Sequence, residues 1–403
     1  MTGAGERGED LRMQQLVLEH GGADYSERLM VIELTAMAPT GEAIGRAPDG
    51  RVVFVPFGIP GERVEVTLTH ERRRFAYARL LRVLRASPER VEPLCPHFAH
   101  CGGCDWQHIA YAAQLRYKTE AVREQLVRLG RIPDPPVRAC VPSPNPYGYR
   151  NRIQLVGAHD GRWGYRARKA HDVTPIDACA IAAPELNALL HAIPAQPGAH
   201  LDVRLSDEGA QRLSAETPVA TMRVGRWRYR VPGNAFFQVN TAVAALLVEE
   251  VLRAATPDPS ARVLDLYCGV GLFTVPLAER AQFVLGVEVN ERAARAAVEN
   301  VRGLRAEIWA MDVKRALASV ALQRERWDIA VLDPPRGGVD PQALRALIRL
   351  NAWRLVYVSC EPATFARDAR RLLDAGYRLE FVQPLDMFPQ TRHVESVACF
   401  THT

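Results

Sequence analysis

The sequence predicts a multidomain α/β protein made of a small N-terminal β-barrel, a central α+β domain with a cysteine cluster, and a C-terminal Rossmann-like domain. Three observations predict it. Short alternating apolar runs fill residues 29–86, three cysteines lie within residues 95–104, and from residue 248 apolar strands alternate with amphipathic helices. The expected boundaries are a flexible leader at 1–27, the barrel at 28–87, the central domain at 88–247 and a catalytic domain at 248–403.

Composition excludes several protein classes. Of the 403 residues, 48% are hydrophobic and 24% charged, as in globular rather than disordered chains. No run of 18 apolar residues is present and the N-terminus is polar, so we expect neither a membrane span nor a secretory signal, and a cytoplasmic location. The net charge is +5, and the basic residues are 48 arginines and three lysines. This excess fits a GC-rich genome, but it is also compatible with an RNA partner; no obligate protein partner is inferred.

The sequence pattern of residues 28–87 predicts a small barrel. Its β-branched, alternating runs are separated by turns rich in Gly and Pro, such as residues 38–45; the runs are 30–38, 51–58, 62–70 and 76–84. Eight arginines and four glutamates lie between Glu62 and Arg90, with Phe75 and Tyr77 among them. Arginines beside aromatic rings favour RNA binding, and the alternative is a solvated edge strand protected by charge.

The central part opens with three closely spaced cysteines, Cys95, Cys101 and Cys104. Three thiolates cannot complete a tetrahedral metal site, so a fourth ligand must come from elsewhere in the chain. Spacing alone fits a four-cysteine zinc site nearly as well as a [4Fe–4S] cluster. A helix is expected over 111–130, and a hairpin over 150–168 around Asp160 and Gly161.

The last part alternates strands and helices, as a doubly wound sheet requires. The expected strands are 261–267, 283–289, 306–312, 328–334, 354–360, 378–386 and 395–403. After the first strand, Gly269 and Gly271 form a turn that lets a ligand approach the backbone, and Glu288 at the end of the next strand can accept both ribose hydroxyls.

A nucleoside without phosphates suits this turn best. The third glycine of a dinucleotide fingerprint is missing, and so is the Lys-Ser/Thr pair of a phosphate-binding loop. We therefore expect S-adenosylmethionine, with Asp265 near its amino acid end and Asp312 near the adenine.

A thiol and a carboxylate are expected at the same sheet edge. Cys360 ends the fifth strand, and Glu395 follows His393 just before the last one. Uracil C5 is a poor nucleophile unless a thiolate first adds to C6, and a base must later remove the C5 proton. Cys360 and Glu395 suit those two roles, with His393 as the alternative base. The rigid Asp333-Pro-Pro-Arg336 loop ends in arginine where amino-methyltransferases carry an aromatic residue, which disfavours N-methylation.

From about residue 28 to the end, the chain resembles the RNA uracil-5 methyltransferases that have an N-terminal TRAM domain and an iron–sulfur centre. The motifs that carry the resemblance are Cys95-x5-Cys101-x2-Cys104, Tyr149-Arg-Asn-Arg152, Asp177-Ala-Cys179, Phe237-Gln238-Val-Asn240, Asp265-Leu-Tyr-Cys-Gly-Val-Gly271, Asp333-Pro-Pro-Arg336, Ser359-Cys360-Glu-Pro362 and His393-Val-Glu395. Two positions depart from the family: Glu361 replaces the usual Asn or Asp, and Leu272 stands where some members carry a polar residue.

The resemblance implies several roles. Cys360 would be the nucleophile and Glu395 the base, with Gln238, Tyr267, Glu288 and Asp333 near the cofactor or the target uracil. Cys179 would be the fourth ligand of a [4Fe–4S] cluster. The substrate would be RNA, with 23S rRNA favoured over tRNA. The remaining alternatives are methylation of a different RNA base and a non-catalytic RNA-binding or assembly factor.

Overall fold

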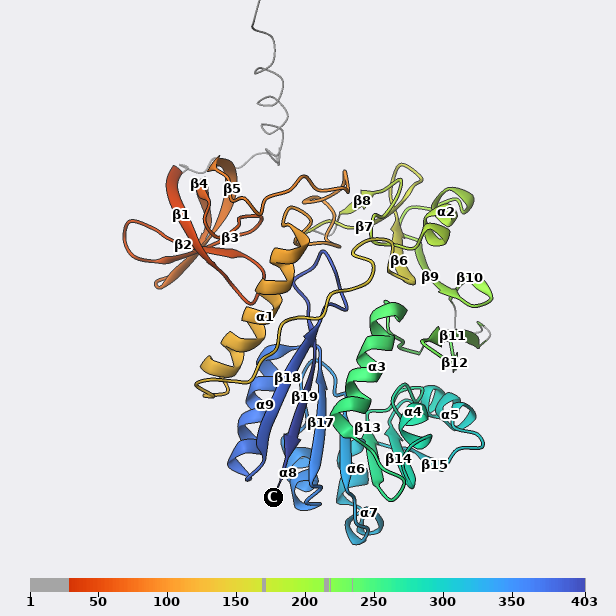
Figure 1. Ribbon diagram of the computed structural model, residues 1–403. Coiled ribbons are helices and arrows are strands. Elements are labelled where there is room, and N and C mark those ends of the chain that lie inside the picture. Colours follow the sequence, from red (N-terminus) through yellow and green to blue (C-terminus); the bar gives the residue numbers. More distant parts are fainter. Residues whose placement is uncertain (1–28, 169–171, 214–216, 218, 234, 403) are drawn as a thin grey trace, which may run out of the picture. The chain divides into compact units, whose positions relative to one another are not determined.

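The computed structural model describes residues 29–168, 172–213, 217, 219–233 and 235–402 (Figure 1). The expected leader at 1–27 lies outside them. By its internal contacts the chain divides into two compact units, one ending at Pro93 but including Asp105–Ala113, the other made of Leu94–Cys104 and Gln114–Thr403. Among the described residues, no helix is long and apolar enough to cross a membrane.

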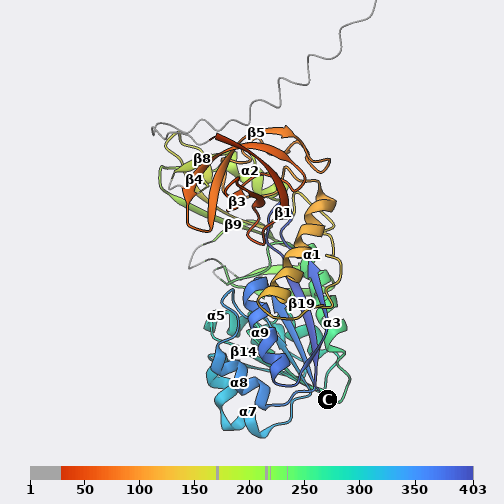
Figure 2. The same ribbon diagram turned by 90° about the vertical axis from the view of Figure 1, so that its left-hand side faces the viewer.

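The first unit contains the predicted barrel, which the structure confirms (Figures 1 and 2). Its strands close in the order β1-β2-β3-β5-β4; they are β1 (Leu29–Met37), β2 (Ala43–Arg46), β3 (Val52–Val55), β4 (Arg63–Glu71) and β5 (Phe75–Arg85). Alternate apolar side chains fill the interior, including Leu34, Val53, Val55, Val64 and Val66. Strand β5 pairs with β3 and with β4, so the arginine-rich segment does not form an edge strand.

The sequence interpretation is wrong about β2. It places residues 38–45 in a turn, and most of β2 lies within that range. Gly45 made the segment look like a turn, but it lies inside the strand, where a Cβ atom would come within 2.7 Å of the Glu33 carbonyl oxygen. The glycine is needed for close approach of two strands rather than for a turn.

The predicted helix, α1 (Tyr111–Arg128), belongs to the second unit except for its first three residues. The second unit also contains the predicted hairpin, β6 (Arg152–Gly157) with β7 (Trp163–Arg166). The hairpin belongs to a five-stranded sheet of order β10-β9-β6-β7-β8, whose other strands are β8 (Val173–Pro175), β9 (His200–Ser206) and β10 (Gly209–Arg212). Helix α2 (Pro184–Ala192) packs onto this sheet through Leu186 and Leu190. A separate hairpin follows, β11 (Ala220–Val224) with β12 (Trp227–Val231).

A seven-stranded sheet forms the rest of this unit, and its strands match the seven expected runs. The order is β15-β14-β13-β16-β17-β19-β18, made of β13 (Arg262–Leu266), β14 (Phe283–Glu288), β15 (Ala306–Ala310), β16 (Ile329–Leu332), β17 (Arg354–Ser359), β18 (Arg378–Leu385) and β19 (Glu395–Thr401). The first five are parallel, whereas β19 runs antiparallel to both β17 and β18. The order reverses at β13, and ligands bind at such a switch point.

Helices cover both faces of the sheet (Figure 1). They are α3 (Thr241–Ala255), α4 (Thr274–Ala278), α5 (Glu291–Asn300), α6 (Val313–Ala318), α7 (Val320–Arg324), α8 (Pro341–Arg349) and α9 (Pro362–Asp374). Successive residues of the strands belong alternately to two apolar clusters. Val263 and Val356 belong to one cluster, and Leu264 and Leu355 to the other. This period of two produces the continuous apolar strands that the sequence shows.

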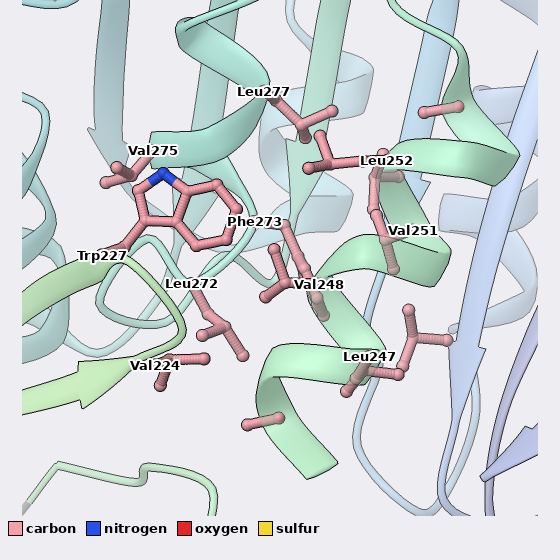
Figure 3. Packing of buried hydrophobic residues seen from close by; sticks show 14 of the residues in the cluster. Val224, Trp227, Leu247, Val248, Val251, Leu252, Leu272, Phe273, Val275 and Leu277 are labelled. Carbon is pink, nitrogen blue, oxygen red and sulfur yellow. The ribbon is translucent and has the colours of Figure 1, made fainter. Parts of the chain in front are cut away.

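Helix α3 spans residue 248, the expected start of the catalytic domain. Its Leu247, Val248 and Val251 belong to one apolar cluster with Trp227 of the preceding hairpin and Phe273 after the glycine turn (Figure 3). The Asn240 side chain caps the helix by accepting from the Val243 N–H.

Candidate active site

The turn that follows β13 has the backbone that its sequence predicts. Tyr267, Gly269 and Gly271 have φ values of 65°, 56° and 89°. Such values suit glycine but strain a tyrosine, and strain of this kind is concentrated at functional sites. The Gly269 N–H donates to Glu288 Oε2 at 3.0 Å and the Asn290 N–H to Glu288 Oε1 at 2.6 Å. Glu288 therefore lies directly at the turn.

Two acidic side chains near this turn have raised pKa values. Asp265 is completely buried at the end of β13 and accepts a hydrogen bond from the Thr274 hydroxyl. Burial raises the pKa of Asp265 to about 7. The hydrogen bond from Thr274 lowers this pKa, whereas the charges of Asp333 and Glu288 raise it. Desolvation raises the pKa of Asp333 to about 7 as well, with Glu288 contributing. The three carboxyl groups thus form one electrostatic group at the switch point.

Cys360 and Glu395 meet through the strand register. Ser359, the last residue of β17, pairs with Ser396 of β19, and because the two strands are antiparallel Cys360 lies beside Glu395. Burial raises the pKa of Cys360 to about 11, and the charges of Glu395 and Asp333 also raise it. Glu395 is only 3% exposed, and burial raises its pKa well above the usual range, again with a contribution from Asp333. The Cys360 thiol, the Glu395 carboxyl and Asp333 therefore share one site.

Arg336 supplies the positive charge in this group. Its guanidinium lowers the pKa of both Cys360 and Glu395. The sequence interpretation used Arg336 only to disfavour N-methylation and missed this role; its position two residues after a rigid carboxylate-proline step was the available signal. The loop is held by α9, since the Thr364 hydroxyl donates to the Arg336 carbonyl at 3.0 Å and Asp368 Oδ2 accepts from the Val339 N–H at 2.9 Å.

The other predicted cofactor residues lie on two further elements. Asp312 is exposed and caps α6 by accepting from the Arg315 N–H at 3.0 Å. Burial raises the pKa of Tyr267 to about 12, and Asp312 is the first charge to add to that rise, so the two side chains are neighbours. Gln238 is buried, and Asn151 Nδ2 donates to its carbonyl at 3.0 Å.

The four predicted metal ligands gather in one region of the second unit. Burial raises the pKa of Cys101 to about 11, and the charges of Cys179 and Cys95 raise it further. The charge of Cys104 acts on Tyr149, as does that of Cys179. Cys95, Cys101 and Cys179 therefore lie close enough to interact electrostatically, and Cys104 and Cys179 both lie near Tyr149. Within the described part of the chain, however, no three or more His, Cys, Asp or Glu side chains are arranged to hold a metal ion.

Similarity to known proteins follows the same division of the chain. Residues 29–81 match the TRAM domain, and residues 213–402 match the tRNA (uracil-5-)-methyltransferase family. A 23S rRNA (uracil(1939)-C(5))-methyltransferase of Pectobacterium carotovorum is 35% identical over 93% of this chain and 94% of its own length. The chain belongs to the RNA uracil-5-methyltransferase family. An uncharacterized RNA methyltransferase of Gloeobacter violaceus is 34% identical, over 94% of this chain and 97% of its own.

A solved structure shares the whole architecture. The tRNA (uracil-54, C5)-methyltransferase of Pyrococcus abyssi superposes with a TM-score of 0.72, is 27% identical, and covers 92% of this chain and 99% of its own. It was solved with S-adenosyl-L-homocysteine, the demethylated form of S-adenosylmethionine. These likenesses confirm an RNA uracil-5-methyltransferase and support both S-adenosylmethionine as cofactor and RNA as partner.

Proposed function

We propose that this chain methylates C5 of a uridine in structured RNA, most favourably 23S rRNA, through a covalent bond between Cys360 Sγ and uracil C6. The observation that carries the proposal is the meeting of a thiol and a buried carboxyl at the ends of β17 and β19. Exocyclic N-methylation requires neither group.

The residues divide the chemistry between them. The Cys360 thiolate adds to C6 of the uracil, and the electron pair of the C5–C6 bond shifts to form an enolate that makes C5 nucleophilic. When bound, S-adenosylmethionine supplies the electrophilic methyl group that C5 takes up. Glu395 then removes the C5 proton, the C5–C6 double bond reforms, and the C6–S bond breaks to return the thiolate. The target base must leave its stack to reach Cys360.

The charges around the site favour the protonation states that Cys360 and Glu395 need in this mechanism. The raised pKa of Glu395 makes its carboxylate a stronger base than a solvent-exposed one. Arg336 opposes the effect of burial on Cys360 and thereby favours the thiolate. Both effects depend on closing the site to water, because charge interactions strengthen in a dry environment.

The cofactor would lie along the turn after β13. Gly269 and Gly271 allow its approach, and Glu288, already held at the turn, would accept the ribose hydroxyls. Asp265, one residue before the end of β13, is proposed to contact the amino acid part and Asp312, the N-cap of α6, the adenine. Tyr267, Asp333 and Gln238 complete the proposed set.

The rRNA assignment rests on sequence likeness. A relative that acts on 23S rRNA is 35% identical, whereas the solved tRNA enzyme is 27% identical. Nucleoside mass spectrometry of separated rRNA and tRNA from cells lacking this chain tests the choice. Loss of 5-methyluridine from tRNA alone would contradict it.

We also propose a [4Fe–4S] cluster on Cys95, Cys101, Cys104 and Cys179. A cubane cluster is wider than a single metal ion, so its four thiolates stand farther apart than the ligands of one zinc ion. The methylation includes no electron transfer, so the cluster would stabilise the fold rather than take part in the reaction.

Replacing the proposed nucleophile tests the covalent mechanism. Cys360→Ala should abolish methyl transfer to RNA and leave S-adenosylmethionine binding intact, because the thiolate acts on the base alone. Cys399→Ala, a buried cysteine within β19, is the matched control and should keep its activity. Near-normal turnover by Cys360→Ala would contradict the mechanism, and an inactive wild-type chain would favour a non-catalytic RNA-binding factor.

A further inference from the structure

We propose that Lys118 and Gln114 of α1 are positioning residues for Glu395, acting through residues 386–394; the inference rests on the proposed function. Neither residue belongs to the cofactor turn or to the group around Cys360. Both reach the loop that connects β18 to the strand on which Glu395 lies.

The first contact is a completely buried ion pair. Lys118 Nζ donates to Asp386 Oδ1 and also to the Phe388 carbonyl at 3.0 Å, and the side chains of Lys118 and Asp386 are both inaccessible to solvent. Placing two opposite charges in the interior is costly, and an apolar pair of similar volume is often as stable. A buried pair is therefore better explained by the conformation it specifies than by the stability it adds.

The second contact is a reciprocal amide pair. Gln114 Nε2 donates to Gln390 Oε1, and the Gln390 N–H donates to Gln114 Oε1, both at 3.0 Å. Gln390 has a φ of 68°, a conformation that costs free energy in a residue other than glycine. Both partners are buried, so α1 holds a strained position of the loop in place.

The strand register connects this loop to the base. Leu385 and Glu395 are paired residues of β18 and β19, so the loop begins and ends at the rung that contains Glu395. Lys118 binds the residue next to that rung. Cys360 lies on a different segment, after β17, and α1 makes these contacts with the loop rather than with β17. Loss of the contacts should therefore displace the base more than the nucleophile.

The two chemical steps can be measured separately. RNA with 5-fluorouridine at the target position allows thiolate addition and methylation but has no C5 proton, so its covalent adduct accumulates without the base. RNA with ordinary uridine requires the base for release. Adduct formation on the first RNA reports on Cys360, and product release on the second reports on Glu395.

Two variants remove the positioning contacts without leaving a buried charge. Lys118→Met/Asp386→Leu replaces the ion pair by apolar side chains, and Gln114→Leu removes the amide pair. Both should form the fluorouridine adduct within about threefold of the wild-type rate but release product about tenfold to hundredfold more slowly, because an error of about 1 Å in geometry costs that much. A methylated adduct with uridine RNA should accumulate in both.

Leu126→Ala is the matched control. Leu126 is a fully buried residue of the same helix that belongs to the apolar cluster containing Phe365 and Leu372 of α9, so its loss destabilises the fold but keeps the ion pair of Lys118 and the amide pair of Gln114. It should affect the two steps equally. Equal slowing of both steps in the positioning variants, or selective slowing of release in Leu126→Ala, would overturn the inference. A wild-type chain that forms no fluorouridine adduct would instead overturn the proposed function.

Discussion

At the scale of the residue, the proposed role of Glu395 as the base depends on its burial. It occupies the first position of β19 with 3% of its surface exposed, and burial raises its pKa well above the usual range. In Glu395→Gln, Cys360 should still add to C6 and C5 should still take the methyl group, but the C5 proton would block elimination. A methylated protein–RNA adduct should therefore accumulate, visible as a shifted, labelled band on a denaturing gel.

The control for this trapping experiment is His393, the alternative base. The Thr391 hydroxyl oxygen accepts from the His393 N–H at 3.3 Å, and the His393 ring lies edge-on to Phe388, so it is part of the same loop. His393→Ala should release product normally. Trapping by His393→Ala and not by Glu395→Gln would assign the base to His393, and Glu395→Gln combined with Cys360→Ala should give no band.

The ionisation of the proposed nucleophile, Cys360, depends on pH, and Arg336 favours the ionised form. Since the pKa of Cys360 is raised to about 11, its thiolate fraction grows about tenfold with each pH unit below that value. The rate of adduct formation with fluorouridine RNA should follow this rise between pH 7 and 9. Arg336→Gln should be slower at every pH in that range, because it removes the charge that lowers the pKa, and Arg336→Lys should recover most of the loss. A rate that does not change with pH would show that thiol ionisation is not limiting.

At the scale of the element, the β4–β5 connection presents three consecutive exposed arginines. Arg72, Arg73 and Arg74 occupy the turn between the two strands and are all exposed. Beside them, Phe75 and Tyr77 alternate with inward-facing residues and group with Phe54, whose ring stacks on Tyr77 at 5.3 Å between centroids. Cations next to outward aromatic rings are typical of single-stranded RNA binding.

Neutralising this turn should weaken RNA binding and leave chemistry unchanged. In Arg72→Gln/Arg73→Gln/Arg74→Gln, KM for RNA should rise, the rate at saturating RNA should stay constant, and the log–log salt dependence should flatten by up to ~0.7 to 0.9 per lost phosphate contact. Arg326→Gln/Arg345→Gln/Arg349→Gln removes the same charge from exposed positions of the catalytic unit and is the matched control. If both variants changed the salt dependence of RNA binding equally, the effect would come from net charge and not from phosphate contacts at this turn.

At the scale of the whole molecule, the cysteine loop ties distant parts of the sequence together. Residues 94–104 belong to the second unit although the segments on either side belong to the first. The loop is joined to the central sheet by backbone contacts, such as the Gly102 N–H donating to the Arg166 carbonyl at 3.2 Å. A cluster bridging this loop and Cys179 would stabilise that arrangement as a metal staple does.

Metal analysis tests the cluster directly. Protein purified without oxygen should be brown and contain about four iron and four sulfide ions per chain, as a cubane cluster requires. Cys179→Ser should lose iron and solubility, whereas Cys140→Ser, a buried cysteine outside the proposed ligand set, should retain both. Stoichiometric zinc without iron would contradict the assignment.

The local sequence pattern predicted most strands and helices of this protein and the chemical groups that they carry. The alternating runs of the barrel, the hairpin at residues 150–168 and the seven apolar strands carry their own periodicity, and each appears where that pattern predicts it. The turn at Gly269 and Gly271 is equally local, because φ values above zero favour glycine. Strand β2 was missed because Gly45 marks a close approach that depends on a neighbouring strand.

Only the tertiary structure decided which distant side chains become neighbours. Cys360 and Glu395 are neighbours because β19 inserts between β17 and β18 in antiparallel register, and no local pattern specifies a pairing between segments so far apart. The same holds for Arg336, which acquires its electrostatic role from the carboxylates and the thiol around it, and for Lys118, whose partner Asp386 lies 268 residues away. Periodicity is a property of the chain, whereas burial and electrostatics depend on which distant residues the fold brings into contact.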